Sequence, residues 1–259
     1  MEKLPKKIFD IIDPKYNWNP VDQGNSQSRI YFLKHQDKIN LYLKINQKNL
    51  ITNLEDEYHR LNWLEGRIPV PKTIAYMKES GLEYLLLTEI IGTPSFKFEN
   101  DNKKAIIKIL ANGLKIIHSI PIYNCPFDQS LDGQIIRVKE IINQKLVNTD
   151  NFDDERKGKN IDQLYSELID TKPGSEDLVF THGDYCLPNV LINDSKLSGF
   201  IDLGRSGIAD RYQDLALCAR SIKYNCNDPE LISTFFEEYG LNTINDEKLR
   251  FYQLLDEFF

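Results

Sequence analysis

Short alternating runs of apolar and polar residues fill much of the first third of the chain and predict a β-rich region. The runs Ile30–Leu33 and Leu41–Ile45 predict two strands joined by a polar turn. The runs Ile74–Met77 and Tyr84–Ile90 predict a further hairpin, with Ser80-Gly81 near its turn.

One helix interrupts this β-rich region. Residues Glu55–Leu64 have helical spacing, and Gly66 follows them at a position that suits a helix C-cap. Pro69 and Pro71 then favour extended chain, because a residue before proline is pushed out of the helical region.

The pattern changes after Gly92. Helical stripes predict helices over Lys103–Ile120, Ile135–Leu146 and Ile161–Ile169, followed by short strands near 178–181, 190–192 and 197–201, and then helix to the last residue. A β-rich part over 1–91 and a larger, mostly helical part over 92–259 predict an α+β protein of two lobes.

Composition narrows the class of protein. The chain has 259 residues, 41% hydrophobic residues and a formal net charge of −7, which is typical of a globular protein and disfavours nucleic acid or an anionic membrane as partner. Its four cysteines are scattered, and the first twenty residues contain no apolar signal segment. These features lead us to expect a cytoplasmic protein with reduced thiols and no membrane span.

The segment His182–Asn189, followed by Gly199–Gly204, carries the strongest chemical signal. An Asp, an Asn five residues later, a short hairpin and a second Asp match the phosphoryl-transfer template of kinases. Asp184 would be the catalytic base, and Asn189 with Asp202 would hold Mg²⁺ through hard oxygen ligands. Taken singly, these residues also suit an Asx turn and a loop cap.

A third interpretation of the same segment is a metallohydrolase site built from His182 and the aspartates. It lacks a second histidine nearby. We therefore expect His182 to be a buried histidine that supports the loop by hydrogen bonding.

The strand Leu41–Ile45 supplies a second, independent signal. Side chains alternate between faces of a strand, so Tyr42 and Lys44 share the face opposite the leucines. Lys44 could neutralise phosphates, Tyr42 could lie against adenine, and Glu57 in the following helix could pair with Lys44. The alternative is an amphipathic edge strand with a surface lysine.

The segment from Gln23 to Ser28 could close over phosphates through backbone N–H groups and the Ser26 hydroxyl. This is a weak signal with one glycine. The glycine patterns of protein kinases and of P-loop enzymes are both missing from the chain.

With these residues in place, the chain resembles the 3′ class of aminoglycoside phosphotransferases, most closely the form found in antibiotic-producing bacilli. The resemblance extends from about Gly24 to Phe259. The segments that carry it are Leu41–Lys44, Trp63–Gly66, Pro69–Pro71, His182–Asp184 with Asn189, Ser198–Arg205, Asp210–Asp214 and Leu255–Phe259.

The resemblance implies a protein-kinase-like fold whose lobe 1–91 binds nucleotide and whose lobe 92–259 carries catalysis and the aminoglycoside. It implies ATP and Mg²⁺ as cofactors and phosphorylation of the 3′-hydroxyl group of kanamycin- or neomycin-type antibiotics, which confers resistance. Apart from the resemblance, we expect a monomer or weak dimer, and the acidic charge leads us to expect no nucleic-acid or membrane partner.

The resemblance also assigns roles to residues. It implies that Asp184 is the base and that Asn189 and Asp202 bind Mg²⁺. It also implies that ATP is bound by Lys44, which pairs with Glu57, and by Tyr42, Ser26 and the backbones of Thr88 and Ile90. The positions that it implies for the antibiotic are Asp153, Asp154, Glu155, Arg205, Arg220, Asp256, Glu257 and the carboxylate of Phe259.

The end of the chain supports a cationic acceptor and also departs from the resemblance. Eight acidic and two basic residues lie between Tyr224 and Phe259, and such a charge balance suits a polycation. The alternative is that these acidic residues are simply the solvated face of exposed helices. The apolar Phe258 and Phe259 argue against this alternative, because they predict that the end of the chain packs against the protein. Some relatives carry an acidic pair where this chain has Tyr224 and Asn225.

Two other functions stay open from the sequence. One is a kinase of the same fold acting on another hydroxylated amine, such as choline or an amino sugar. The other is a catalytically silent nucleotide-binding module, against which the joint presence of Asp184, Asn189, Asp202, Lys44 and Glu57 counts.

Overall fold

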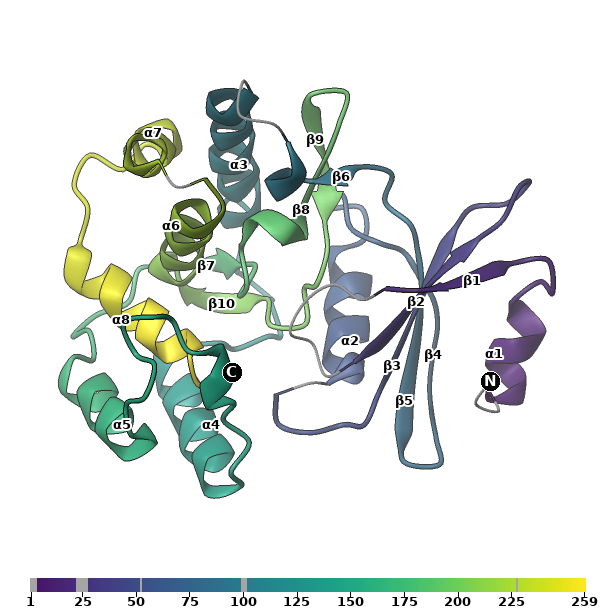
Figure 1. The fold of residues 1–259 in the computed structure, drawn as a ribbon, viewed down its shortest axis with the longest axis horizontal. Helices are drawn as coiled ribbons and strands as arrows, with labels where there is room; N and C mark the ends of the chain where they lie inside the picture. Colours follow the sequence, from purple (N-terminus) through teal and green to yellow (C-terminus); the bar gives the residue numbers. More distant parts are fainter. Residues whose placement is uncertain (1–3, 22–27, 52, 99–101, 227) are drawn as a thin grey trace. The chain divides into compact units, whose positions relative to one another are not determined.

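A computed structural model describes residues 4–21, 28–51, 53–98, 102–226 and 228–259. The chain divides into two compact units, Met1–Ile91 and Gly92–Phe259 (Figure 1). No described helix has the length and apolar character needed to cross a membrane.

The first unit is built on an antiparallel sheet with strand order β1-β2-β3-β5-β4. The strands are β1 (Asn17–Pro20), β2 (Arg29–Lys34), β3 (Leu41–Asn46), β4 (Thr73–Glu79) and β5 (Leu82–Thr88). Two helices accompany the sheet, α1 (Lys6–Ile11) and α2 (Leu54–Leu64). The predicted hairpin is confirmed, and Ser80 and Gly81 make its turn with φ of 52° and 78°.

The alternation predicted for β3 is confirmed. Leu41, Leu43 and Ile45 are buried and pack in one cluster with Ile8 of α1. Tyr42 and Lys44 occupy the other face and are half-buried. The apolar face therefore fixes the direction in which Lys44 projects.

Helix α2 is anchored at its start by side chains. Asn53 accepts hydrogen bonds from the N–H groups of Glu55 and Asp56, and buried Glu83 of β5 accepts one from Leu54 N–H at 3.0 Å. The helix ends at Leu64, as predicted, and Gly66 follows with φ of 77°. The caps fix the register of the helix and so the position of Glu57.

The second unit combines two small sheets with helices. Its β structure consists of β6 (Thr93–Pro94), β8 (Val190–Asn193) and β9 (Lys196–Phe200) in one sheet and β7 (Leu178–Thr181) with β10 (Gly207–Asp210) in the other. Its helices are η1 (Ser95–Lys97), α3 (Lys103–His118), α4 (Leu131–Asn143), η3 (Thr149–Asn151), α5 (Ile161–Asp170), η4 (Leu187–Asn189), α6 (Tyr212–Cys226), α7 (Pro229–Tyr239) and α8 (Asp246–Asp256).

Two predictions for this unit are wrong. Helix α4 begins four residues before Ile135, because the distant Glu176 carboxylate accepts the N–H of Leu131, and it ends at Asn143 because Lys145 adopts φ of 56°. The stretch after Ile201 is not all helical, since Gly207–Asp210 forms β10 against β7. The early start of α4 and the formation of β10 both depend on partners more than twenty residues away along the chain.

Helix α3 contacts α7, β7 and β9 of the second unit. Its apolar stripe, from Ile106 to Ile117, is buried and packs against α7. Gly113 of this helix faces Tyr185, whose hydroxyl donates to the Leu110 carbonyl oxygen at 2.7 Å. A Cβ atom at position 113 would lie 2.8 Å from the Tyr185 hydroxyl oxygen and 3.3 Å from the Phe200 ring.

We expect Gly113→Ala to lower the free energy of unfolding by about 1–3 kcal/mol, because overpacking at Tyr185 outweighs the helix propensity of alanine. Gly133→Ala on α4 is the matched control, since a Cβ there has only the Ser130 hydroxyl within reach, at 3.9 Å. The control should gain up to about 1 kcal/mol. Urea unfolding measures both, and equal changes in the two variants would contradict the packing argument.

Candidate active-site loop

The loop between β7 and η4 is held in place by a buried carboxylate. Asp214 of α6 is fully buried, and its two oxygens accept the N–H groups of His182 at 2.7 Å and Gly183 at 2.9 Å. Gln213 adds a hydrogen bond from its side-chain N–H to the Gly183 carbonyl oxygen at 3.1 Å. The backbone just before Asp184 is therefore fixed from three directions.

A second row of side chains supports Asp214. His118 places its Nε2 3.1 Å from the Asp214 carboxylate and its Nδ1 2.7 Å from the Tyr239 hydroxyl, to which Arg211 donates at 2.9 Å. Because a carboxylate only accepts hydrogen bonds, the contact with Asp214 places a proton on Nε2 of His118. Sequence reasoning assigned His118 no role, and its only signal was a polar residue at the end of an apolar helix.

Gly183 is needed at its position for two reasons. Its φ of 86° lies in the left-handed region, which favours glycine. A Cβ atom there would also lie 2.1 Å from the Arg205 carbonyl oxygen. The loop and the segment after Asp202 are thereby in direct backbone contact.

His182 supports the loop, as predicted. Its Nδ1 accepts the Asp184 N–H at 3.3 Å, and its Nε2 donates to the Ile201 carbonyl oxygen at 3.0 Å. Both ring nitrogens are engaged and the side chain is buried. The metallohydrolase interpretation of His182 therefore has no ligand atom available.

The three residues predicted for chemistry meet at one end of the β8–β9 hairpin. Asn189 immediately precedes β8 and donates from Nδ2 to the Asp184 carbonyl oxygen at 3.0 Å and to its carboxylate Oδ2 at 2.9 Å. Asp202 follows β9, and the Ile201 N–H donates to the Asn189 carbonyl oxygen at 3.0 Å. Because Nδ2 of Asn189 is committed to Asp184, its Oδ1 is the amide atom suited to a hard cation.

Two features of this cluster are unusual for carboxylates. Burial raises the pKa of the Asp184 carboxyl above its usual value, against the opposing pull of the Arg205 guanidinium. Asp202 has φ of 59°, an uncommon conformation for a residue with a side chain that typically costs about 1–3 kcal/mol. Such local strain occurs preferentially at functional positions.

Beside this loop, arginines and carboxylates from distant segments form a charge cluster. Asp256 lies between two guanidinium groups, with Arg205 at 2.8 Å and Arg220 in close contact. Burial alone would raise the pKa of the Asp256 carboxyl, but the two arginines outweigh burial and hold that pKa below its usual value. The Arg205 guanidinium also lies 4.8 Å from the centre of the Phe259 ring.

Glu257 belongs to the same charge cluster. Its buried carboxylate pairs with Arg156 at 3.0 Å and accepts the Asp153 N–H. Burial, with the neighbouring Asp153 charge, raises the pKa of Glu257 to about 7 despite Arg156. Phe258 is buried, so the predicted docking of the last residues is confirmed.

The acidic loop predicted for the antibiotic already has basic partners. Asp153 contacts Arg220 at 3.4 Å, Asp154 contacts Lys157 at 2.6 Å, and Glu155 contacts Lys223 at 3.3 Å. Asp154 and Glu155 are highly exposed. Their contact with an acceptor stays a prediction.

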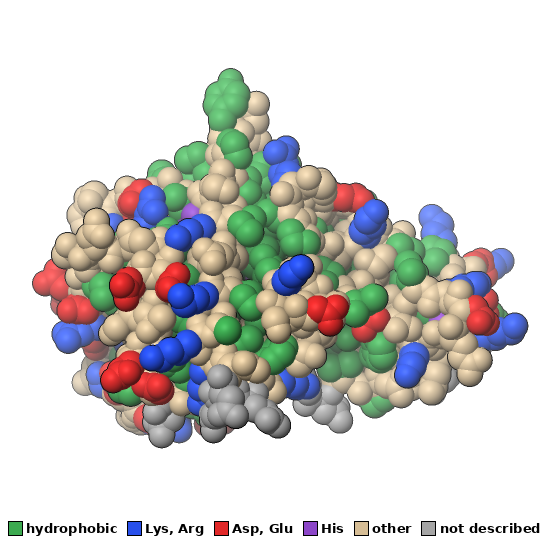
Figure 2. Space-filling model, turned by 90° about the horizontal axis from the view of Figure 1, so that it is seen from above, with side chains coloured by type: hydrophobic (Ala, Val, Ile, Leu, Met, Phe, Trp, Pro, Cys, Tyr) green, Lys and Arg blue, Asp and Glu red, His purple; other side chains and the backbone are tan. Residues whose placement is uncertain are grey.

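The acidic run near the end of the chain is not one continuous patch. Asp228 caps α7 and Glu238 pairs with Lys108, whereas Asp256 pairs with Arg205 and Glu257 with Arg156. Figure 2 shows acidic and basic side chains interspersed over the face that it draws. Tyr224, one of the two departures from the resemblance, is 87% exposed.

The first unit holds the second predicted set. Lys44 Nζ lies 2.7 and 3.0 Å from the carboxylate oxygens of Glu57, and both side chains are largely buried. This confirms the predicted pair. Tyr42 packs against Phe32 with ring centres 5.0 Å apart, and burial raises the pKa of its hydroxyl.

The remaining positions predicted for the nucleotide are only partly described. Thr88 ends β5, and its backbone N–H donates to the Lys72 carbonyl oxygen at 2.9 Å. This backbone N–H is therefore already engaged. Ile90 is half-buried just beyond the strand. Ser26 lies outside the described residues.

Comparisons with known proteins show the family to which this chain belongs. The profile of the Phosphotransferase enzyme family matches residues 17–252. The aminoglycoside 3′-phosphotransferase of Niallia circulans is 38% identical over 91% of this chain and 90% of its own length, and that of Enterococcus faecalis is 36% identical over 99% and 98%.

Solved structures are similar as well. The aminoglycoside-3′-phosphotransferase of type VIII matches with a TM-score of 0.87 and 33% identity, covering 95% of both chains. An aminoglycoside phosphotransferase from Streptomyces rimosus, solved with ADP and streptomycin, matches with a TM-score of 0.80 and 26% identity over 93% of this chain and 92% of its own.

The support of the loop can be tested at Asp214. In Asp214→Asn one acceptor oxygen becomes an NH₂ group that faces a backbone N–H, which we expect to cost about 1–3 kcal/mol of unfolding free energy. Amide hydrogen exchange at His182 or Gly183 should also become faster. Asp132→Asn, at a side chain that is 81% exposed, should change stability by less than about 1 kcal/mol. Unchanged exchange in Asp214→Asn would show that the carboxylate is not what holds the loop.

Proposed function

The chain belongs to the phosphotransferase enzyme family, and from this premise we propose that it transfers the γ-phosphoryl group of ATP to the 3′-hydroxyl group of aminoglycoside antibiotics and so confers resistance. The observation that carries the proposal is the Asp184–Asn189 pair, held beside Asp202. It supplies a base and two cation ligands in a chain that is similar to such enzymes over nearly its whole length.

In this mechanism Asp184 orients the acceptor hydroxyl and receives its proton as the new P–O bond forms and the bond to the β-phosphate oxygen breaks, which leaves ADP. Asn189 holds Oδ2 of Asp184, so Oδ1 is the oxygen that we assign to the acceptor.

The donor atoms of this loop suit Mg²⁺. The amide oxygen of Asn189 and the carboxylate of Asp202 are hard oxygen ligands, and Mg²⁺ commonly takes its other ligands from water and phosphate. When bound, the ion would neutralise charge on the phosphates. No group of three or more His, Cys, Asp or Glu side chains with metal-site spacing occurs among the described residues.

We assign the nucleotide to the first unit. Lys44, which Glu57 holds in a fixed orientation, would contact the phosphates, and Tyr42 would lie against adenine. Because the Thr88 N–H is engaged by Lys72, the Thr88 carbonyl and the Ile90 backbone are the groups that we propose for the adenine edge.

We assign the acceptor to the charge cluster and the acidic loop. Asp154 and Glu155 are the exposed carboxylates there, and we expect them to attract ammonium groups directly. Asp256 and Glu257 are already paired with arginines, so their acceptor contact would require partial exchange of those partners. Cytoplasmic location and a monomer or weak dimer remain predictions.

Product analysis tests the proposal against the two alternatives. We expect ATP consumption with kanamycin, one phosphate on its 3′ oxygen, and none with choline or with a 3′-deoxy aminoglycoside. Consumption with choline would favour a kinase for another amine. Nucleotide binding without turnover on any acceptor would favour a silent binding module.

Asp184→Asn should lower kcat by about 10²- to 10⁴-fold, because the base is lost while its shape is kept. ADP binding, measured by calorimetry, should persist. Asp170→Asn, at an exposed position on α5, should keep full activity. An Asp184→Asn enzyme with more than about a tenth of the normal kcat would rule out Asp184 as the base.

Lys44→Ala should raise the KM for ATP or lower kcat by at least about tenfold, with the KM for the aminoglycoside little changed, since Lys44 is assigned to the phosphates. The control is Lys48→Ala, which removes an exposed lysine paired with Glu55 and should leave both constants unchanged. A change confined to the KM for the aminoglycoside would contradict the assignment.

A further inference from the structure

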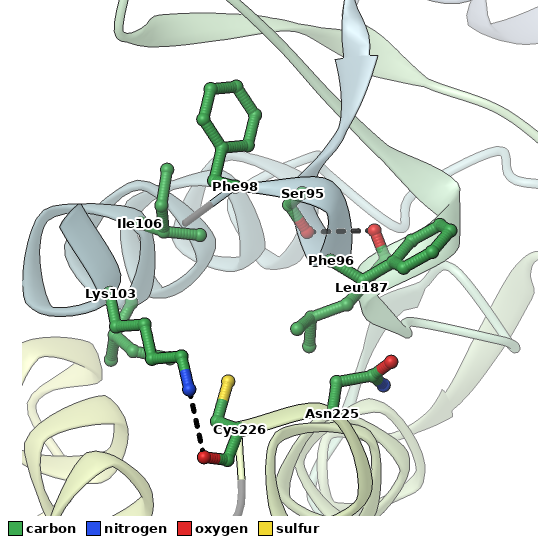
Figure 3. A pocket seen from close by; sticks show the side chains of 9 residues that line it. Ser95, Phe96, Phe98, Lys103, Ile106, Leu187, Asn225 and Cys226 are labelled. Carbon is green, nitrogen blue, oxygen red and sulfur yellow. Dashed lines mark hydrogen bonds between the residues drawn. The ribbon is translucent and has the colours of Figure 1, made fainter. Parts of the chain in front are cut away.

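Two backbone segments of the proposed site are held on both sides by hydrogen bonds from other parts of the chain. In the second unit, the Ser95 hydroxyl donates to the Leu187 carbonyl oxygen of η4 at 2.7 Å (Figure 3), and the Leu187 N–H donates to the Ser221 hydroxyl at 3.0 Å. The other segment follows β5 in the first unit. It is held by Lys72 and Asn40, and the proposed mechanism gives Asn40 no role.

The segment after β5 is held through both backbone and side-chain groups. On the β4 side, the Thr88 N–H donates to the Lys72 carbonyl oxygen at 2.9 Å, and the Lys72 N–H donates to the Thr88 hydroxyl at 2.9 Å. On the β3 side, the Glu89 N–H donates to the Asn40 carbonyl oxygen at 2.9 Å, and Nδ2 of Asn40 donates to the Glu89 carboxylate at 2.8 Å. Each of the two residues is therefore fixed by a pair of hydrogen bonds.

A third contact fixes the orientation of the Asn40 amide. Its Oδ1 accepts the His35 N–H at 3.0 Å, which leaves Nδ2 to face Glu89. The buried His35 ring accepts the N–H groups of Asp37 and Lys38 through Nδ1, so the turn before Asn40 has hydrogen bonds of its own. Asn40 therefore links an ordered turn to the segment after β5.

Asn40 and Glu89 lie next to the strand face that we assign to the nucleotide. Asn40 is two residues before Tyr42, so strand alternation, continued by one residue, places both on the same face. Leu41 pairs with Thr88 in the ladder, and the bond from Glu89 to Asn40 extends this ladder by one residue pair. Burial, together with the Glu89 charge, raises the pKa of the Tyr42 hydroxyl, which agrees with a carboxylate close to that ring.

We propose that Asn40 is a positioning residue that makes this site select adenine over guanine. The inference rests on the proposed function, which assigns the purine to the backbones of Thr88 and Ile90. Adenine offers an amino donor and a ring-nitrogen acceptor to a carbonyl and an N–H, whereas guanine offers a carbonyl acceptor and an N–H donor at the same two positions. Guanine can pair only if the segment moves. Asn40 and Lys72 hold the segment against this movement, so guanine leaves polar groups unpaired.

Calorimetric titration of the full chain with ADP, GDP and inorganic tripolyphosphate tests the proposal without an acceptor. We expect the unsubstituted chain to bind ADP at least about tenfold more tightly than GDP. Asn40→Ala should weaken ADP binding by about tenfold, because the segment that contacts adenine is released on one side. It should change GDP and tripolyphosphate binding by less than about threefold. A general loss of folding would weaken all three ligands together.

Reciprocal exchange of the two side chains separates positioning from folding. Asn40→Asp places two carboxylates opposite each other and should weaken ADP binding at least as much as Asn40→Ala. When Glu89→Gln is added, the new amide donates to the new carboxylate, which still accepts the His35 N–H. ADP binding should then return to within about threefold of the unsubstituted chain. The control is Asn49→Ala, at a half-buried turn residue beyond the other end of β3, which should leave all three affinities unchanged.

Three results would overturn the proposal: no preference of the chain for ADP over GDP, equal weakening of both by Asn40→Ala, or no recovery in the double variant. Aminoglycoside phosphorylation is measured separately. If no aminoglycoside is phosphorylated while selective ADP binding depends on Asn40, the proposed function fails and the role of Asn40 stands. If aminoglycosides are phosphorylated while selectivity is independent of Asn40, the proposed function stands and the role of Asn40 is wrong.

Discussion

The active-site loop depends on one buried carboxylate. Asp214 accepts the N–H groups of His182 and Gly183, which would otherwise have no hydrogen-bond partner in the interior. Because a buried unpaired N–H costs about as much as a lost hydrogen bond, this contact selects a single conformation of the loop. The positions of Asp184 and Asn189 follow from it, since they lie immediately downstream and bond to each other.

Contact between the loop and the segment after β9 adds a second constraint. The Gly183 backbone and the Arg205 carbonyl are so close that no side chain fits between them, and His182 bonds to Ile201. Asp202 lies between these two anchors. These contacts hold Asp202, which has φ of 59°, close to Asn189, and these are the two residues proposed as cation ligands.

Charge is arranged differently in the two units. In the first, the Lys44–Glu57 pair is largely buried, and Glu83 of β5 accepts the first N–H of α2 and so helps to fix the helix that carries Glu57. In the second, arginines from three segments neutralise Asp153, Asp256 and Glu257. These ion pairs hold the end of the chain in place. Asp154 and Glu155 are the more exposed carboxylates of this region.

The sequence by itself determined the features that depend on local periodicity and spacing. Strand alternation placed Lys44 opposite the core, and helical spacing placed Glu57 in the helix that follows this strand. The five-residue step from Asp184 to Asn189 placed the two residues on either side of a single turn. Each is fixed by dihedral preferences and by burial of an apolar face, which neighbouring residues encode.

The tertiary structure alone decided features whose partners lie far along the chain. Strand β10 exists because β7 offers it a ladder, α4 begins early because Glu176 accepts its first N–H, and the terminal carboxylates are neutralised because Arg156, Arg205 and Arg220 converge on them. A hydrogen bond or ion pair of this kind forms only when the fold has brought its two members together. The local pattern of residues therefore does not predict such a contact.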